Sequence, residues 1–145
     1  MEKTILKSKI SEYNFLKLFI STMVIQNQGI IINKYELECK LFDFYDDPNF
    51  HFLFEDICKK IGIDTKSINL DYAFQSALTF GLLSLVKDFG SVRFIINISK
   101  EDAKKINSEF STYEKIAMKE LCNRLSYNET TDKNFILNKK KKECK

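Results

Sequence analysis

The spacing of the hydrophobic residues changes sharply at Gly81. Before this glycine, hydrophobic residues recur every three or four positions, which is typical of helices buried along one face. After it come two apolar, β-rich runs, 82–87 and 92–98, joined by a segment that contains Gly90. Two such runs around a glycine-containing turn predict a β-hairpin. We therefore expect a mainly α fold with a small β-hairpin, an α+β class.

Four hydrophobic patterns before Gly81 predict four helices, and two further helices are expected after the hairpin. The first four are 11–28, 33–45, 48–61 and 69–80. Ile30–Ile32 has the composition of a very short strand, and residues 63–67 form a polar link. Ser99 and Ser111 each precede an acidic residue by three positions, as at helix starts. The second of these starts opens a hydrophobic stripe within 111–125, which either packs inside the chain or forms the seam of a homodimer.

The net charge of +3 is unevenly distributed. Residues 133–145 hold six lysines against Glu143 and so contribute +5, which leaves −2 on residues 1–132. The sequence predicts one globular domain over 1–132 and a flexible basic tail over 133–145. The tail could contact phosphate or an anionic membrane surface, but a solvated terminal tail is the simpler interpretation.

Composition bears on the origin and location of the protein. Ile, Lys, Asn and Phe are abundant and have AT-rich codons, which is typical of low-GC bacterial, phage or plasmid genomes. The four cysteines lack C-x-x-C spacing and paired histidines, so reduced thiols are expected rather than a zinc site or a disulfide framework. Residues 1–9 lack the apolar region of a signal peptide, and 15–25 is too short to span a bilayer. We expect a cytoplasmic protein without membrane contact.

The order of the expected elements resembles the winged helix-turn-helix superfamily over residues 11–98. A long first helix, a tiny strand, short helices and a closing hairpin follow one another in that arrangement. Residues 77–86 resemble the end of a recognition helix that leads into the first wing strand, and 92–96 would be the return strand. The helix expected at 48–61 departs from the minimal core. The resemblance implies a winged-helix-like core with a C-terminal helical extension, and DNA binding.

The residues in the recognition position fit DNA poorly. The helix 69–80 contains no Lys or Arg and includes Asp71, although affinity for DNA comes largely from cations that contact phosphate. The candidate nucleic-acid contacts there and in the wing are Asn69, Gln75, Thr79, Lys87 and Arg93. A DNA-binding transcriptional regulator is therefore the alternative function and not the first choice.

An acidic, aromatic segment favours a protein partner instead. Residues 34–58 carry seven acidic side chains against Lys34 and Lys40. This segment could dock on a basic, nucleic-acid-binding protein by charge complementarity, while the plainer alternative is a set of solvated helix faces. The candidate contact residues are Glu36, Glu38, Asp43, Tyr45, Asp46, Asp47, Phe50 and Glu55.

No motif in the sequence points to catalysis, to a cofactor or to a metal. The only histidine, His51, lies four residues before Glu55, a spacing that is common by chance. The four glycines lie far apart and form no phosphate loop. The sequence therefore predicts a non-enzymatic regulator or inhibitor of bacterial or mobile-element type that acts by contact with another protein.

Overall fold

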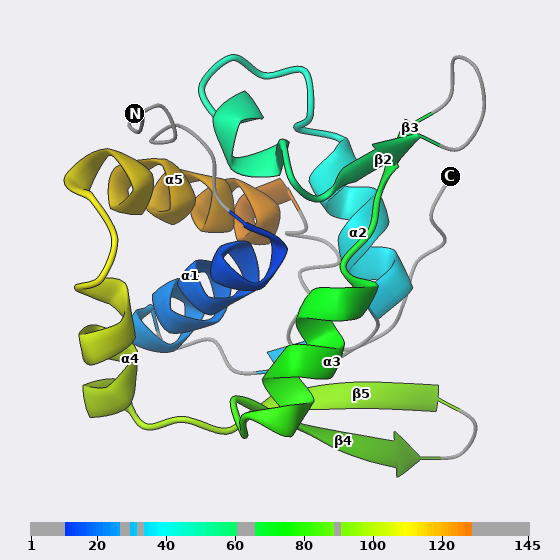
Figure 1. The fold of residues 1–145 in the computed structure, drawn as a ribbon, viewed down its shortest axis with the longest axis vertical. Helices are drawn as coiled ribbons and strands as arrows, with labels where there is room; N and C mark the ends of the chain where they lie inside the picture. The colour runs from blue at the N-terminus through cyan, green and yellow to red at the C-terminus, as the bar shows by residue number, and fades with distance from the viewer. Residues whose placement is uncertain (1–10, 27–29, 32–33, 61–65, 89–90, 129–145) are drawn as a thin grey trace, which may run out of the picture.

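The computed structural model describes residues 11–26, 30–31, 34–60, 66–88 and 91–128, and its fold is α+β, as expected (Figure 1). Five α-helices and one short 3₁₀-helix are combined with five short strands in the described part of the chain. The α-helices are α1 (Glu12–Ile25), α2 (Lys34–Phe42), α3 (Asp71–Thr79), α4 (Lys100–Asn107) and α5 (Thr112–Asn128). The strands are β1 (Ile30–Ile31), β2 (Cys58–Lys60), β3 (Lys66–Ile68), β4 (Leu83–Asp88) and β5 (Ser91–Ile96).

Helix α1 lies at the centre of the molecule and packs against α3, α4 and α5 (Figure 1). Its buried residues cover most of its circumference, which is the pattern of a helix enclosed by others. Ser11 caps its N-terminus by accepting a hydrogen bond from the backbone N–H of Asn14 at 3.2 Å. The helix ends at Ile25, before the expected end at residue 28, which lies outside the described residues.

The expected hairpin forms, and β1 joins it. Strands β4 and β5 pair antiparallel from Leu83↔Ile96 to Asp88↔Ser91, and β1 pairs with the other edge of β5, giving the order β1-β5-β4. Phe94 of β5 meets Phe74 of α3 edge to face at 4.7 Å between ring centroids. One face of this sheet is therefore fastened to α3.

A glycine with a positive φ ends α3 where the hydrophobic spacing changes. Gly81 has φ +83°, a conformation that L-residues with a Cβ rarely adopt. Around it, Leu82 N–H donates to the Ala77 carbonyl at 2.9 Å and Gly81 N–H donates to the Leu78 carbonyl at 3.3 Å. This pair of bonds is a Schellman motif, which satisfies the last carbonyls of the helix and turns the chain into β4.

The prediction of a helix over 48–61 is wrong. The chain instead runs through turns and the 3₁₀-helix η2 (His51–Phe54) and then enters β2, which pairs antiparallel with β3. The prediction of a polar link over 63–67 is wrong at its C-terminal end as well, because Lys66 and Ser67 belong to β3. Phe50, Leu53, Phe54 and Ile57 are nevertheless buried, as a helix would also have buried them. The spacing identified the inward-facing residues, but not the backbone conformation.

Helix α5 packs the predicted C-terminal stripe against the core of its own chain. Ala117, Met118, Leu121 and Leu125 are buried in the core of the same chain, and the helix runs on to Asn128. A reciprocal capping box begins it: Ser111 N–H donates to Glu114 Oε1 at 2.9 Å, and Glu114 N–H donates to Ser111 Oγ at 3.1 Å. Among the described residues, none of the helices is long and apolar enough to cross a membrane.

Candidate protein-contact surface

The two carboxylates Glu12 and Glu38 hold the N-terminus of α3. Glu38 Oε2 accepts a hydrogen bond from Leu70 N–H at 2.7 Å, and Glu12 Oε2 accepts one from Ala73 N–H at 3.1 Å. Between them, Asn69 Oδ1 accepts from Asp71 N–H at 2.9 Å. The first N–H groups of a helix have no partner within it, and the helix dipole favours negative charge there. Glu38 and Asn69, both predicted as contact residues, therefore help to position α3.

Lys34 links this capping arrangement to the surface. Its Nζ lies 3.0 Å from Glu38 Oε2 and also pairs with Asp71. Burial lowers the pKa of Lys34, but the hydrogen bonds to Asp71 and Glu38 outweigh it and leave that pKa above its ordinary value. The hydrogen bond from Lys34 lowers the pKa of Asp71. Asp71, the only charged residue of α3, thus has its charge paired.

The predicted contact residues of the acidic segment differ in exposure. Asp43, Asp46 and Glu55 are exposed, whereas Phe50 is fully buried. Asp47 accepts a hydrogen bond from Asn49 N–H at 2.9 Å. Glu36, Asp47 and Tyr45 are half-buried. Of the two predicted aromatic contact residues, Phe50 is therefore enclosed in the core, whereas Tyr45 keeps part of its surface accessible.

Arg124 of α5 fastens this segment to the core. Its guanidinium lies over the Phe50 ring at 5.7 Å and 3.9 Å from Asp47 Oδ2, and it also pairs with Glu120 at 3.0 Å. Tyr45 stacks on Phe42 and contacts His51. Asp47, Phe50 and Tyr45 consequently have packing roles that explain their presence without a partner.

His51 occupies a structural position. Its Nδ1 lies 2.9 Å from the Tyr45 carbonyl oxygen, and its ring meets the Tyr45 ring edge to face at 4.8 Å. Cys58 and Cys122 are free thiols, and burial raises the pKa of Cys122. Cys39 is disulfide-bonded, so the expectation of reduced thiols is wrong for this residue.

The outer face of α3 presents apolar and neutral groups. Gln75 and Thr79, the predicted base-reading residues, are exposed there. Beside them on the same helix or at its end are exposed hydrophobic side chains: Tyr72 (63%), Leu78 (36%) and Phe80 (67%). Large exposed hydrophobic side chains grouped on one element mark contact sites more often than isolated ones do. This face could accept an apolar surface of a partner.

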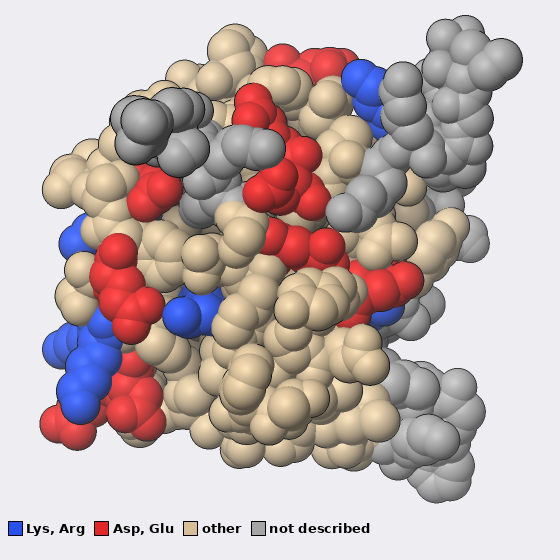
Figure 2. Space-filling view, viewed as in Figure 1, with Lys and Arg blue, Asp and Glu red and all other residues tan. Residues whose placement is uncertain are grey.

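The hairpin extends this uncharged face. Leu85 is 48% exposed and lies opposite Phe94 in the register, on the sheet face that meets α3. Figure 2 shows a broad area without charged side chains over α3 and the part of the hairpin beside it. Acidic side chains gather above this area in the view. Arg93 is half-buried, and the side chain of Lys87 lies outside the described residues. We call Tyr72, Leu78, Phe80 and Leu85 the α3 patch.

The sequence did not predict the α3 patch, because the spaced hydrophobic residues of 69–80 were all interpreted as one buried face. The residues that fill the core, Ala73, Phe74 and Ala77, already occupy one face at spacings of three and four. The helix and its end carry more large apolar residues than this one buried face can hold, which indicates that some of them lie on the surface. No family model matches the chain, and comparisons with curated proteins and with solved structures gave no match either.

Proposed function

We propose that this protein is a non-enzymatic regulator or inhibitor that acts by stoichiometric contact with another protein. The α3 patch is its docking surface, and the uncharged outer face of α3 is the observation that carries the proposal. The core of an interface is apolar and poor in charged residues, whereas a DNA contact relies on cations. The exposed apolar residues of α3, with the paired Asp71 as its only charged residue, support a protein partner.

The order of elements supports a winged-helix-like core for this proposal. Helix α1, strand β1, helices α2 and α3 and the β4–β5 hairpin follow one another as the resemblance requires. In such a core α3 occupies the recognition position, which here would contact a protein instead of a DNA groove. The β2–β3 pair is an addition between α2 and α3. A bacterial or mobile-element origin, cytoplasmic location and regulatory role belong to the same proposal.

Charge specifies the chemistry of the partner. Asp43, Asp46 and Glu55 are exposed, and residues 34–58 as a whole carry net negative charge. Acidic side chains also border the uncharged area over α3 (Figure 2). The complementary partner is a basic protein, such as a nucleic-acid-binding protein, with an apolar patch that fits the α3 patch.

The first experiment separates the protein partner from DNA. We expect fluorescence anisotropy with an AT-rich duplex to detect no tight binding by the full chain once Lys139–Lys142 are replaced by glutamine. Tight, salt-dependent binding by that variant, lost on K87Q/R93Q, would establish the DNA-binding regulator and overturn the protein-contact proposal.

The second experiment locates the surface. A partner captured by the full chain is purified, and its affinity is measured for the wild type, Y72S/F80S and the matched control Y113S/I116S. Tyr113 and Ile116 are equally exposed but lie on α5. We expect Y72S/F80S to weaken binding at least about tenfold, because apolar anchors dominate interfaces, and the control to bind normally. Unchanged affinity of Y72S/F80S would exclude the α3 patch.

A further inference from the structure

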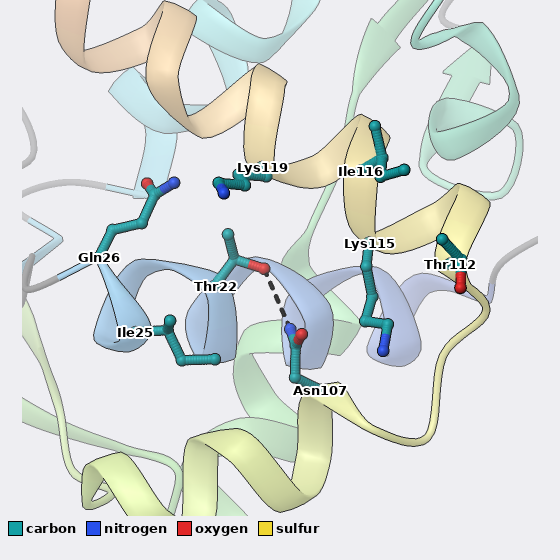
Figure 3. Close-up of a pocket in the computed structure, with 8 residues that line it drawn as sticks. All are labelled: Thr22, Ile25, Gln26, Asn107, Thr112, Lys115, Ile116 and Lys119. Carbon is teal, nitrogen blue, oxygen red and sulfur yellow. Dashed lines mark hydrogen bonds between the residues drawn. The ribbon is translucent and has the colours of Figure 1, made fainter.

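The polar groups of the groove between α1, α4 and α5 do not meet at one point (Figure 3). The groove encloses about 330 Å³, and its lining residues include Lys115 and Lys119 of α5. The ammonium ends of these two lysines point away from each other in Figure 3. Asn107, which closes the lower side, already donates a hydrogen bond to Thr22 Oγ1 at 3.3 Å. Aligned polar groups are found instead along the outer edge of the β1-β5-β4 sheet.

The outer edge of this sheet is β4, which has β5 on one side and no strand on the other within the described part of the chain. In Figure 1 it lies at the margin of the fold, below α3. Asn97 N–H donates to the Leu82 carbonyl at 2.8 Å, so these two residues form a hydrogen-bonded pair of the ladder. Such pairs occur at every second residue, which makes Ser84 the next residue of β4 that bonds to β5. The backbone N–H and C=O groups of Leu85 and Lys87 therefore point to the outer edge.

The first four residues of β4 lack the features that usually protect an edge strand. Charged side chains, proline residues and bulges keep such strands from pairing with another chain. Leu83–Val86 contains no charged residue and no proline, and charge appears only at Lys87 and Asp88. The register with β5 matches one residue to one throughout, so the strand has no bulge against β5. This part of the edge is therefore open to a further strand.

Leu85 joins the outer edge of β4 to the α3 patch. Its backbone N–H points outward, and its side chain is 48% exposed on the sheet face that meets α3. Leu83, two residues earlier on the same face, is buried. In a strand added beside β4, every second side chain would point to this face and contact Leu85 and its neighbours in the α3 patch. The edge and the patch thus form one continuous docking surface.

We propose that the protein partner binds by adding an extended segment of its chain to the edge of β4. Its backbone bonds to Leu85 and Lys87, and its alternate side chains, which are apolar, face the α3 patch. In this mode of recognition the main-chain bonds supply affinity and the alternate side chains supply specificity. The acidic side chains around the uncharged area favour basic residues at the ends of the segment (Figure 2). The inference rests on the proposed function, because Leu85 belongs to the α3 patch, and it adds the form of the partner.

The probe is a peptide with blocked ends in which valine and threonine alternate and a lysine stands at each end. It is titrated into the full chain, and the hydrogen exchange of single backbone amides is measured by two-dimensional NMR. With saturating peptide we expect the amides of Leu85 and Lys87 to exchange at least about tenfold more slowly than in the free chain, because the added strand accepts their bonds. The amides of Ser84 and Val86 should be protected with and without peptide, since they bond to β5. The same peptide with N-methyl groups on its central amides should slow none of them further.

Two variants at one position separate the main chain from the side chain. L85A removes the apolar side chain and keeps the N–H group, whereas L85P removes both. Because this N–H points away from β5, proline there leaves the β4–β5 bonds in place. We expect L85A to weaken peptide binding about threefold and L85P to weaken it about tenfold further. If L85P fails to fold, exchange in the wild type with the peptide and with its N-methylated form remains decisive.

The outcomes distinguish the edge from the α3 patch. Fast exchange of the Leu85 and Lys87 amides at millimolar peptide, or equal binding by L85A and L85P, would overturn the edge proposal. Slow exchange of both amides in the free chain that becomes fast on dilution would assign the edge to a second copy and would also overturn it. A purified partner that binds Y72S/F80S weakly but leaves both amides in fast exchange would confine the contact to α3 and would overturn the edge proposal alone. Unchanged affinity of Y72S/F80S would exclude the α3 patch, whatever the peptide does at the edge.

Discussion

At the scale of single residues, several acids that resemble an interaction surface in the sequence serve the fold instead. Glu38 is the clearest case, because its carboxylate joins Leu70 N–H to Lys34 across two helices while being only 9% exposed. A carboxylate that caps another helix of the chain cannot be recognised from the sequence, since the N–H group that it accepts from lies 32 residues away. Net charge over a segment therefore overstates the charge that a partner could reach.

The capping role of Glu38 predicts that E38A lowers the free energy of unfolding by about 1–3 kcal/mol, because a buried N–H is left without an acceptor. The matched control is E55A, which removes the same side chain at an exposed site and should change stability by less than about 0.5 kcal/mol. Urea unfolding followed by circular dichroism measures both. Equal stability of E38A and E55A would show that the Glu38 carboxylate does not stabilise the N-terminus of α3.

At the scale of elements, hydrophobic spacing predicted the helices and the β4–β5 hairpin but not the segment between α2 and α3. Leu53 and Ile57 there close turns through bonds from their N–H groups to the carbonyls of Phe50 and Phe54, three residues earlier. Asn69 N–H then donates to the Ile57 carbonyl at 2.7 Å, beside the β2–β3 pair. The bond from Asn69 and the β2–β3 pairs join residues that are far apart in the sequence, and such pairing leaves no local periodicity. The spacing therefore predicted the buried side chains correctly and the backbone conformation wrongly.

The turn at the end of α3 predicts how replacing Gly81 changes stability. G81A should lower the free energy of unfolding by about 1 kcal/mol, because a residue with a Cβ is strained at positive φ. A Cβ at Gly81 would meet nothing within 4 Å, so the loss is conformational and not steric. G81N should lose less, since Asn tolerates this region. Chemical unfolding of the wild type, G81A and G81N measures the order of their stabilities. A G81A protein as stable as the wild type would contradict the positive φ assigned to Gly81.

At the scale of the whole molecule, the helical extension α4–α5 completes the core. Helix α1 is enclosed only because α3 covers one part of it and α4 and α5 cover others. The residues of the α5 stripe that sequence analysis left open as a dimer seam contribute four buried side chains to this core, while Tyr113 and Ile116 remain exposed. A core without α5 would leave part of the apolar surface of α1 in water, so α4 and α5 should unfold together with the rest of the core.

This packing predicts that L121A lowers the free energy of unfolding by about 2–5 kcal/mol, because removing a fully buried leucine leaves a cavity. The matched control is I116A on the exposed side of the same helix, which should cost less than about 0.5 kcal/mol. Denaturant midpoints measured over a hundredfold range of protein concentration should not move, because Leu121 packs within its own chain. A midpoint that rises with concentration, together with a large loss in I116A, would instead identify α5 as a seam between two copies, since association stabilises by mass action.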